Sequence, residues 1–152
     1  MSSKLFAKAR NLLAQETKTR ISGPRPSPDG AKGKLSIALA YPNRYYTAMS
    51  NLGFQTVYQL FNDQPETVCQ RVYWPDLEDL AEYRRTETPL FALESQQPVR
   101  TFDILAFSIS YENDYPHLLQ MMELAGIPLR SQERKEGDPL VMAGGATVLM
   151  NP

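Results

Sequence analysis

The sequence predicts an α/β fold in which a parallel sheet carries helices on both faces. From Leu35 onward, short apolar runs of strand character alternate with segments of helical periodicity. Four such runs are visible, and turn-forming residues lie between them. Because the crossover in a strand-helix-strand unit is right-handed, this alternation predicts parallel strands with helices on both faces of the sheet.

The four predicted strands are short and largely apolar. They are Leu35–Tyr41, Thr67–Trp74, Asp103–Ser110 and Pro139–Gly144. For units of this length we expect a flavodoxin-like (Rossmann-like) sheet with the order 2-1-3-4. A fifth strand would follow the fourth in that fold, so we expect it to be missing through truncation. A short edge strand at Leu90–Leu93 remains an open alternative.

Three predicted helices connect the strands, and each follows a residue that can cap it. Ser50 can cap a helix that runs to Asn62, and Asp76 one that runs to about Arg85. Asp114 can cap a third helix, with Pro116 in its first turn. The apolar residues of these segments recur at helical spacing and face the sheet. Gly126 is expected to end the third helix.

The N-terminal part differs from the rest, and we divide the chain into an arm, residues 1–33, and a domain, residues 34–152. Apolar residues at helical spacing predict an amphipathic basic helix over Ser3–Glu16. Ser22–Lys34 is rich in proline, glycine and serine and reads as a linker. Packing against the rest of the protein is the preferred interpretation of the helix; a presequence or a membrane-surface helix remains an alternative.

Charge is distributed as unevenly as composition. Residues 1–34 carry eight lysines and arginines against two acidic residues, a formal charge of +6, while the chain as a whole is at −1. The remainder therefore carries −7, which disfavours binding of phosphate backbones by the body of the domain. No apolar run approaches the roughly 20 residues that span a bilayer, and no secretory signal is visible. We expect a cytoplasmic protein without a membrane segment.

A ligand site is expected at the carboxyl ends of the strands, where the strand order reverses. The loops after the first, third and fourth strands supply polar groups there. Gly144 and Gly145 add a place where backbone can approach a ligand, although a tight turn explains them equally well. The candidate binding residues are Asn43, Arg44, Tyr45, Ser108, Ser110, Glu112, Gly144, Gly145 and Ala146.

Other chemistries find little support. One cysteine, Cys69, cannot form an internal disulfide or a metal-cysteine cluster, and we interpret it as a small strand residue. The only histidine, His117, is interpreted as a solvated helix residue. Neither G-x-G-x-x-G nor a Walker motif occurs. No catalytic or metal-binding residue can be nominated, so we expect no turnover by these 152 residues alone.

Four segments, "YPNRY", "MSNLGFQ", "LESQ" and "AGG", carry a resemblance to a known family. From about Leu35 to Pro152 the chain resembles the N-terminal, cobalamin-binding-like domain of radical S-adenosylmethionine (radical SAM) proteins. The resemblance implies a flavodoxin-like domain followed by a C-terminal radical SAM barrel of the same chain. In that barrel a C-x-x-x-C-x-x-C motif holds a [4Fe-4S] cluster that cleaves S-adenosylmethionine; this sequence lacks the motif.

The resemblance leaves two functions open. One is a corrinoid-binding domain that presents cobalamin to the barrel, supported by small residues near the strand ends. The other is a degenerate docking or substrate-positioning domain without cofactor, supported by the absence of a D-x-H-x-x-G motif and by the bulky "NRYY" loop. Exposed apolar surface on the fourth-strand side is expected in both, with self-association as a consequence. The substrate is not indicated.

Overall fold

The computed structural model describes residues 1–19 and 33–150. Its sheet has four parallel strands in the order β2-β1-β3-β4, as predicted. The elements, in chain order, are α1 (Ser3–Thr19), β1 (Leu35–Tyr41), α2 (Tyr45–Met49), α3 (Leu52–Asn62), β2 (Thr67–Tyr73), α4 (Leu77–Thr86), β3 (Ile104–Ser108), α5 (Tyr115–Ala125), β4 (Leu140–Gly144) and α6 (Ala146–Met150), with 3₁₀ turns at Val99–Thr101, Glu112–Asp114 and Ser131–Glu133.

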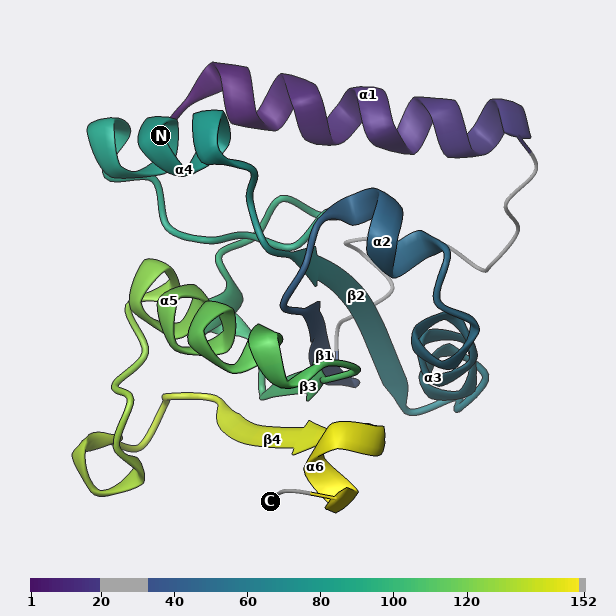
Figure 1. The fold of residues 1–152 in the computed structure, drawn as a ribbon, viewed down its shortest axis with the longest axis vertical. Helices are drawn as coiled ribbons and strands as arrows, with labels where there is room; N and C mark the ends of the chain where they lie inside the picture. The colour runs from purple at the N-terminus through teal and green to yellow at the C-terminus, as the bar shows by residue number, and fades with distance from the viewer. Residues whose placement is uncertain (20–32, 151–152) are drawn as a thin grey trace.

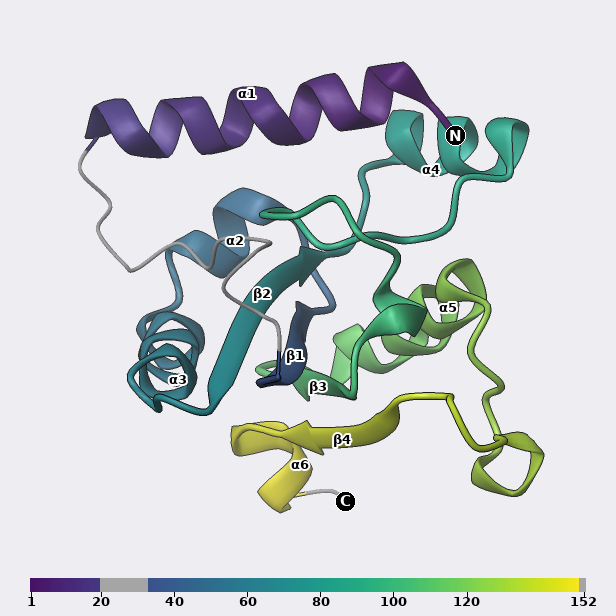
Figure 2. The same ribbon diagram turned by 180° about the vertical axis from the view of Figure 1, so that it is seen from behind.

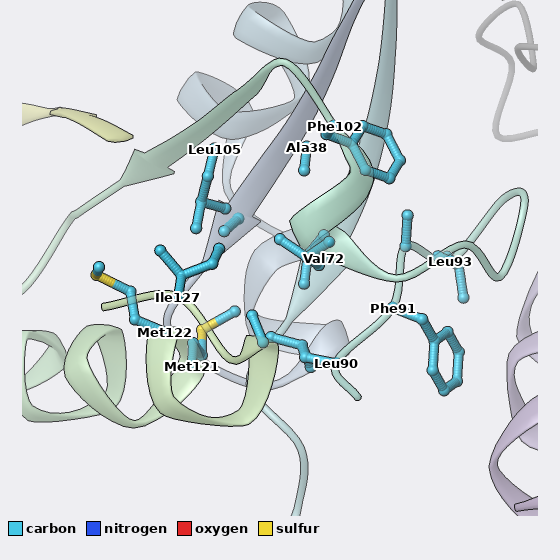
Figure 3. Packing of buried hydrophobic residues seen from close by; sticks show 14 of the residues in the cluster. Ala38, Val72, Leu90, Phe91, Leu93, Phe102, Leu105, Met121, Met122 and Ile127 are labelled. Atoms are coloured by element: carbon cyan, nitrogen blue, oxygen red, sulfur yellow. The ribbon is translucent and has the colours of Figure 1, made fainter. Parts of the chain in front are cut away.

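Helices α3 and α5 lie on opposite faces of the sheet (Figures 1 and 2). On the α5 face, Leu105 and Phe107 of β3 pack with Met121 and Met122 of the helix. Figure 3 shows Leu105 beside Met121 and Met122, together with the buried segment around Leu90. On the α3 face lies a separate cluster of buried residues, which includes Ile37, Leu39, Phe54, Tyr58, Cys69 and Ala106. Each large apolar side chain that is fully buried in these clusters contributes roughly 1.5–3 kcal/mol to the stability of the fold.

Cys69 lies in β2 and is fully buried, which confirms its interpretation as a strand residue. Burial raises the pKa of its thiol, with the Glu94 carboxylate adding to the effect. The reactive thiolate form is therefore disfavoured at neutral pH.

Two of the predicted helix caps are wrong. Asn51, rather than Ser50, caps α3, since its Oδ1 accepts a hydrogen bond from the backbone N–H of Phe54 at 2.9 Å. Ser50 instead ends α2, a short helix that the apolar pattern did not reveal. Asp114 precedes α5 but its side chain caps nothing, because the chain enters the helix from a 3₁₀ turn in helical conformation. Asp76 caps α4 and Gly126 ends α5 as predicted.

The open alternative at Leu90–Leu93 is resolved against a strand. One isolated antiparallel bridge joins Phe91 to Pro98, and the segment is otherwise irregular. Its backbone is nevertheless satisfied locally, since Leu90 N–H donates to Leu124 O and Leu93 N–H donates to Arg71 O. The segment thus covers the outer edge of β2 without joining the sheet.

Helix α1 runs three residues beyond the predicted end at Glu16 and lies across the top of the molecule above α2 and α4 (Figures 1 and 2). Leu5 and Ala9 are buried against the domain, and the Lys8 ammonium pairs with the carboxylates of Asp76 and Asp79. The predicted packing of this helix against the rest of the protein is confirmed. Most of the predicted linker, Ser22–Lys34, lies outside the described residues.

Candidate functional site

The carboxyl edge of the sheet consists of two unlike halves. Helix α1 covers the half formed by the ends of β1 and β2 (Figures 1 and 2). The half formed by β3 and β4 is open, since Gly144, Gly145 and Ala146 are exposed. The two halves therefore differ: the covered half forms a pocket beneath α1, and the open half is an exposed platform.

The predicted site residues are divided between these halves. Arg44 and Tyr45, at the start of α2, line the pocket beneath α1. Ser108 of β3 pairs in register with Gly144 of β4 on the open half. Glu112 is exposed in the 3₁₀ turn before α5, and Ala146 begins α6. The remaining residues, Asn43 and Ser110, lie between the two halves.

Between the halves, the point where the strand order reverses is closed by side-chain hydrogen bonds. Asn43 Nδ2 donates to Asp114 Oδ1 at 3.1 Å. Asn51 Nδ2 donates to Ser110 Oγ at 3.1 Å and to the Tyr41 hydroxyl at 3.3 Å. Asp114 and Asn51 were missed by sequence reasoning, which assigned Asp114 a capping role. Asn43, Asp114, Asn51, Ser110 and Tyr41 thus form a hydrogen-bonded polar group, called the plug below, at the reversal point.

Asp114 is unusual within this plug. The residue is 2% exposed, and its second carboxylate oxygen, Oδ2, has no hydrogen-bond partner among the described residues. Burial raises the pKa of this carboxyl group above its ordinary value, and the Asn43 hydrogen bond opposes the shift only in part. The folded domain therefore favours the protonated acid more than the unfolded chain does.

This raised pKa makes a prediction for stability against pH. The protonated Asp114 stabilises the folded domain fully at a pH below its ordinary pKa. This stabilisation is lost as the pH rises through the raised folded-state pKa, because the unfolded chain then binds fewer protons than the folded one. We expect the free energy of unfolding, measured with urea, to fall less between pH 4 and pH 7 in Asp114→Asn than in the parent chain. An identical pH profile for both proteins would contradict the assignment.

His117 is not the solvated residue that the sequence suggested. Its ring stacks on the indole of Trp74, with centroids 4.7 Å apart and an interplanar angle of 12°. Its Nδ1 lies 3.0 Å from the carbonyl oxygen of Pro42, and the residue is half-buried. The histidine therefore ties α5 to the ends of β1 and β2, away from the open half of the edge.

The backbone around Gly145 requires a residue without a Cβ. Its φ is +118°, and an added Cβ would overlap the carbonyl oxygen of Ile109 and lie 3.0 Å from the carbonyl carbon. The Ile109 N–H donates to Gly144 O at 2.8 Å, and this bond joins the end of β4 to the residue that follows β3. At Gly144 an added Cβ would meet nothing within 4 Å. Of these two glycines, Gly144 is therefore the one at which a side chain would have room.

Beneath α1, a buried ion cluster fixes the covered half of the edge. Arg71 of β2 donates from both terminal nitrogens to the Glu16 carboxylate of α1, each at 2.8 Å. Its Nε donates to Glu94 Oε1 at 2.6 Å, and its backbone N–H to Glu94 Oε2 at 2.8 Å. The Tyr45 hydroxyl also donates to Glu16, at 2.7 Å. Three elements that are distant in sequence therefore meet at one guanidinium.

The cluster raises the pKa values of Arg71 and Tyr45. Burial alone would lower the pKa of Arg71, but the neighbouring carboxylates, Glu94 foremost, outweigh it and the pKa is raised. The pKa of Tyr45 is raised by burial and by the hydrogen bond to Glu16. Arg71 lies within a run that otherwise reads as a buried strand, and a charge in such a run requires a partner. That signal in the sequence could have located the cluster.

A pocket of about 350 Å³ adjoins the cluster. Apolar and aromatic side chains form most of its wall, and Lys8, Arg44, Arg71, Asp76 and Asp79 contribute charges. Its aromatic and apolar lining comes from Leu5, Ala9, Leu12, Tyr45, Tyr46, Tyr73, Trp74, Pro75, Tyr83, Phe91 and Leu93. The volume lies at the lower end of the range for small-molecule sites.

Residues 1–19 and 33–150 contain no group of three or more His, Cys, Asp or Glu side chains arranged to hold a metal ion. Within the same residues, every helix is too short or too polar to cross a lipid bilayer.

Comparison with known proteins gives one family. The model of radical SAM proteins, N-terminal, matches residues 53–152, which is about two thirds of the chain. No curated protein and no solved structure matches the chain significantly. The matched residues include all of α3 except Leu52, the strands β2, β3 and β4, and the open half of the carboxyl edge.

Proposed function

The chain belongs to the family of N-terminal domains of radical SAM proteins, and from this premise we propose that it presents a corrinoid to a C-terminal radical SAM barrel of the same parent enzyme. The barrel would carry the [4Fe-4S] cluster and S-adenosylmethionine. The observation that carries the proposal is the open half of the carboxyl edge. Ser108 and Ala146 have small side chains there, and Gly144, which has none, borders space in which an added Cβ would meet nothing within 4 Å.

The residues of the open half are compatible with a corrinoid. A bound corrinoid would supply methyl transfer or another radical modification. Ser108, Gly144 and Ala146 would hold it through small polar and backbone groups, and Gly145 would keep β3 and β4 close enough to form the platform. His117 is stacked on Trp74 and contacts Pro42, so cobalt ligation by this histidine forms no part of the proposal.

An absorption titration tests the corrinoid proposal. We expect a saturable spectral change when the chain is titrated with hydroxocobalamin or methylcobalamin, and loss of that change in Gly144→Trp, whose side chain would fill the free space. Gly145 is unsuitable for blocking, because any side chain there disturbs Ile109. Leu60→Trp, at an exposed position on α3, is the matched control and should bind as the parent chain does.

A second function, a docking domain without cofactor, is favoured by a separate observation. The outer part of β4 and the short helix after it expose large apolar side chains: Leu140 (65%), Met142 (45%), Leu149 (87%) and Met150 (78%). Apolar surface of this kind at a sheet edge suits contact with another protein domain, here the barrel, and makes self-association of the isolated chain the expected state. Sedimentation velocity at increasing concentration measures that association.

The same titration separates the two functions when it is repeated on the parent enzyme. No spectral change at high micromolar corrinoid, with the barrel present, would contradict the corrinoid proposal and leave docking as the function. Binding that persists in the Gly144→Trp enzyme would place the corrinoid elsewhere and contradict the assigned platform.

A further inference from the structure

A carboxylate receptor lies beneath α1 on the covered half of the carboxyl edge. Three donors converge on the Glu16 carboxylate: both terminal nitrogens of Arg71, at 2.8 Å each, and the Tyr45 hydroxyl, at 2.7 Å. The side chains of Arg71 and Glu16 are 5% and 3% exposed. A forked guanidinium with a third donor is the geometry with which proteins recognise carboxylates.

Both donor residues have contacts of their own besides Glu16. Arg71 Nε is held by Glu94, and the guanidinium lies 5.0 Å from the centroid of the Tyr58 ring, to which it contributes a cation–π contact. Tyr45 packs edge-on against Tyr73, with ring centroids 5.2 Å apart. The receptor is therefore organised by β2, α2, α3 and the Glu94 loop, whereas its present ligand comes from α1.

Helix α1 has its own attachments along its N-terminal half. Leu5 and Ala9 are buried, the Lys8 ammonium pairs with Asp76 and Asp79, and Gln96 Nε2 donates to Phe6 O at 3.0 Å. These contacts lie two to three turns from Glu16. Withdrawal of the Glu16 carboxylate therefore leaves the helix anchored.

The receptor opens onto the pocket of about 350 Å³, which both Arg71 and Tyr45 line. The rest of the wall is mainly aromatic and apolar, and the pocket lies where β1 and β2 end. Carboxyl ends of parallel strands are the usual ligand position in such folds. A ligand in this pocket could place a carboxylate against Arg71 and Tyr45 and an apolar body against the rest of the wall.

We propose that Arg71 and Tyr45 form a binding subsite for a small-molecule carboxylate with an apolar or aromatic body, and that Glu16 occupies it as an internal ligand. The external carboxylate replaces that of Glu16 on the same three donors, and its body fills the adjoining pocket. Glu16 thereby sets the threshold concentration for binding. The subsite is separate from the open half of the edge and does not rest on the proposed corrinoid function.

Trp74, the single tryptophan of the chain, lines this pocket and reports on its occupancy. We would titrate the parent chain and Glu16→Ala with 3-phenylpropionate and with its neutral amide, following tryptophan fluorescence. Glu16→Ala is expected to bind the acid at least about tenfold more tightly than the parent chain does, and about tenfold more tightly than it binds the amide. Glu136→Ala, which removes an exposed acid far from the pocket, should behave as the parent chain.

A second substitution tests the donor set. In the Glu16→Ala background, Tyr45→Phe keeps the ring contacts and removes one donor, so affinity for the acid should fall severalfold while affinity for the amide stays unchanged. Equal binding of acid and amide by Glu16→Ala, or equal binding of the acid by Glu16→Ala and the parent chain, would overturn the proposal.

Folding is controlled with Glu16→Gln, which keeps the shape of the side chain and an acceptor oxygen for Arg71. This variant is expected to fold and to bind the acid more tightly than the parent chain. Should Glu16→Gln also fail to fold, Glu16 would be a structural requirement rather than a displaceable ligand, and the proposal would be wrong.

Discussion

Arg71→Ala is expected to lower the free energy of unfolding by about 3–5 kcal/mol, because it leaves buried carboxylates without their counter-charge. The side chains of Glu16 and Glu94 are 3% and 2% exposed, so both carboxylates have little contact with solvent in the folded domain. Domains of this size are stabilised by about 5–15 kcal/mol in total. Urea unfolding followed by circular dichroism would measure the loss.

The matched control is Arg85→Ala. Arg85 also pairs with a glutamate, Glu82, but its side chain is 72% exposed, and surface pairs of this kind contribute about 0–1 kcal/mol. The two variants remove the same side chain from two ion pairs that differ in burial. A similar, small loss in both would mean that the Arg71 cluster is hydrated in solution and does not hold the covered half together.

Much of the fold could be predicted because it depends on patterns that are local in sequence. The run Leu35–Tyr41 is a strand as expected, and the strand predicted at Thr67–Trp74 ends one residue earlier, at Tyr73. The order 2-1-3-4 follows from crossover handedness and unit length. Ser50 and Asp114 failed as caps because capping depends on the conformation with which the chain enters the helix, and residue type alone does not determine it.

The candidate site was less predictable because its contacts are long-range. Glu16 and Arg71 are 55 positions apart, and Asn43 and Asp114 are 71 apart. The topology rule correctly placed the loops after β1, β3 and β4 at one edge, yet it could not show that α1 covers half of that edge. The interpretation of His117 as a solvated residue was wrong for the same reason, since its partners Pro42 and Trp74 follow β1 and β2, far from α5 in sequence.

Gly145→Ala is the second substitution with a large expected effect. The backbone at Gly145 has φ of +118°, a conformation that costs a residue with a Cβ about 1–3 kcal/mol. The new Cβ would in addition overlap the carbonyl oxygen of Ile109, so β3 and β4 would have to separate at their carboxyl ends. We expect a loss of at least about 2 kcal/mol in the free energy of unfolding.

Gly144→Ala is the neighbouring control, since its Cβ meets nothing within 4 Å and its φ lies outside the left-handed region. Its loss should stay near the few tenths to 1 kcal/mol typical of exposed positions. Amide hydrogen exchange localises the difference: in Gly145→Ala the Ile109 N–H, which donates to Gly144 O, should exchange faster, while amides of β1 and β2 keep their protection. Equal stability of the two variants would show that the β3–β4 junction yields without cost, and the open half of the edge would then lack the rigid platform that ligand presentation requires.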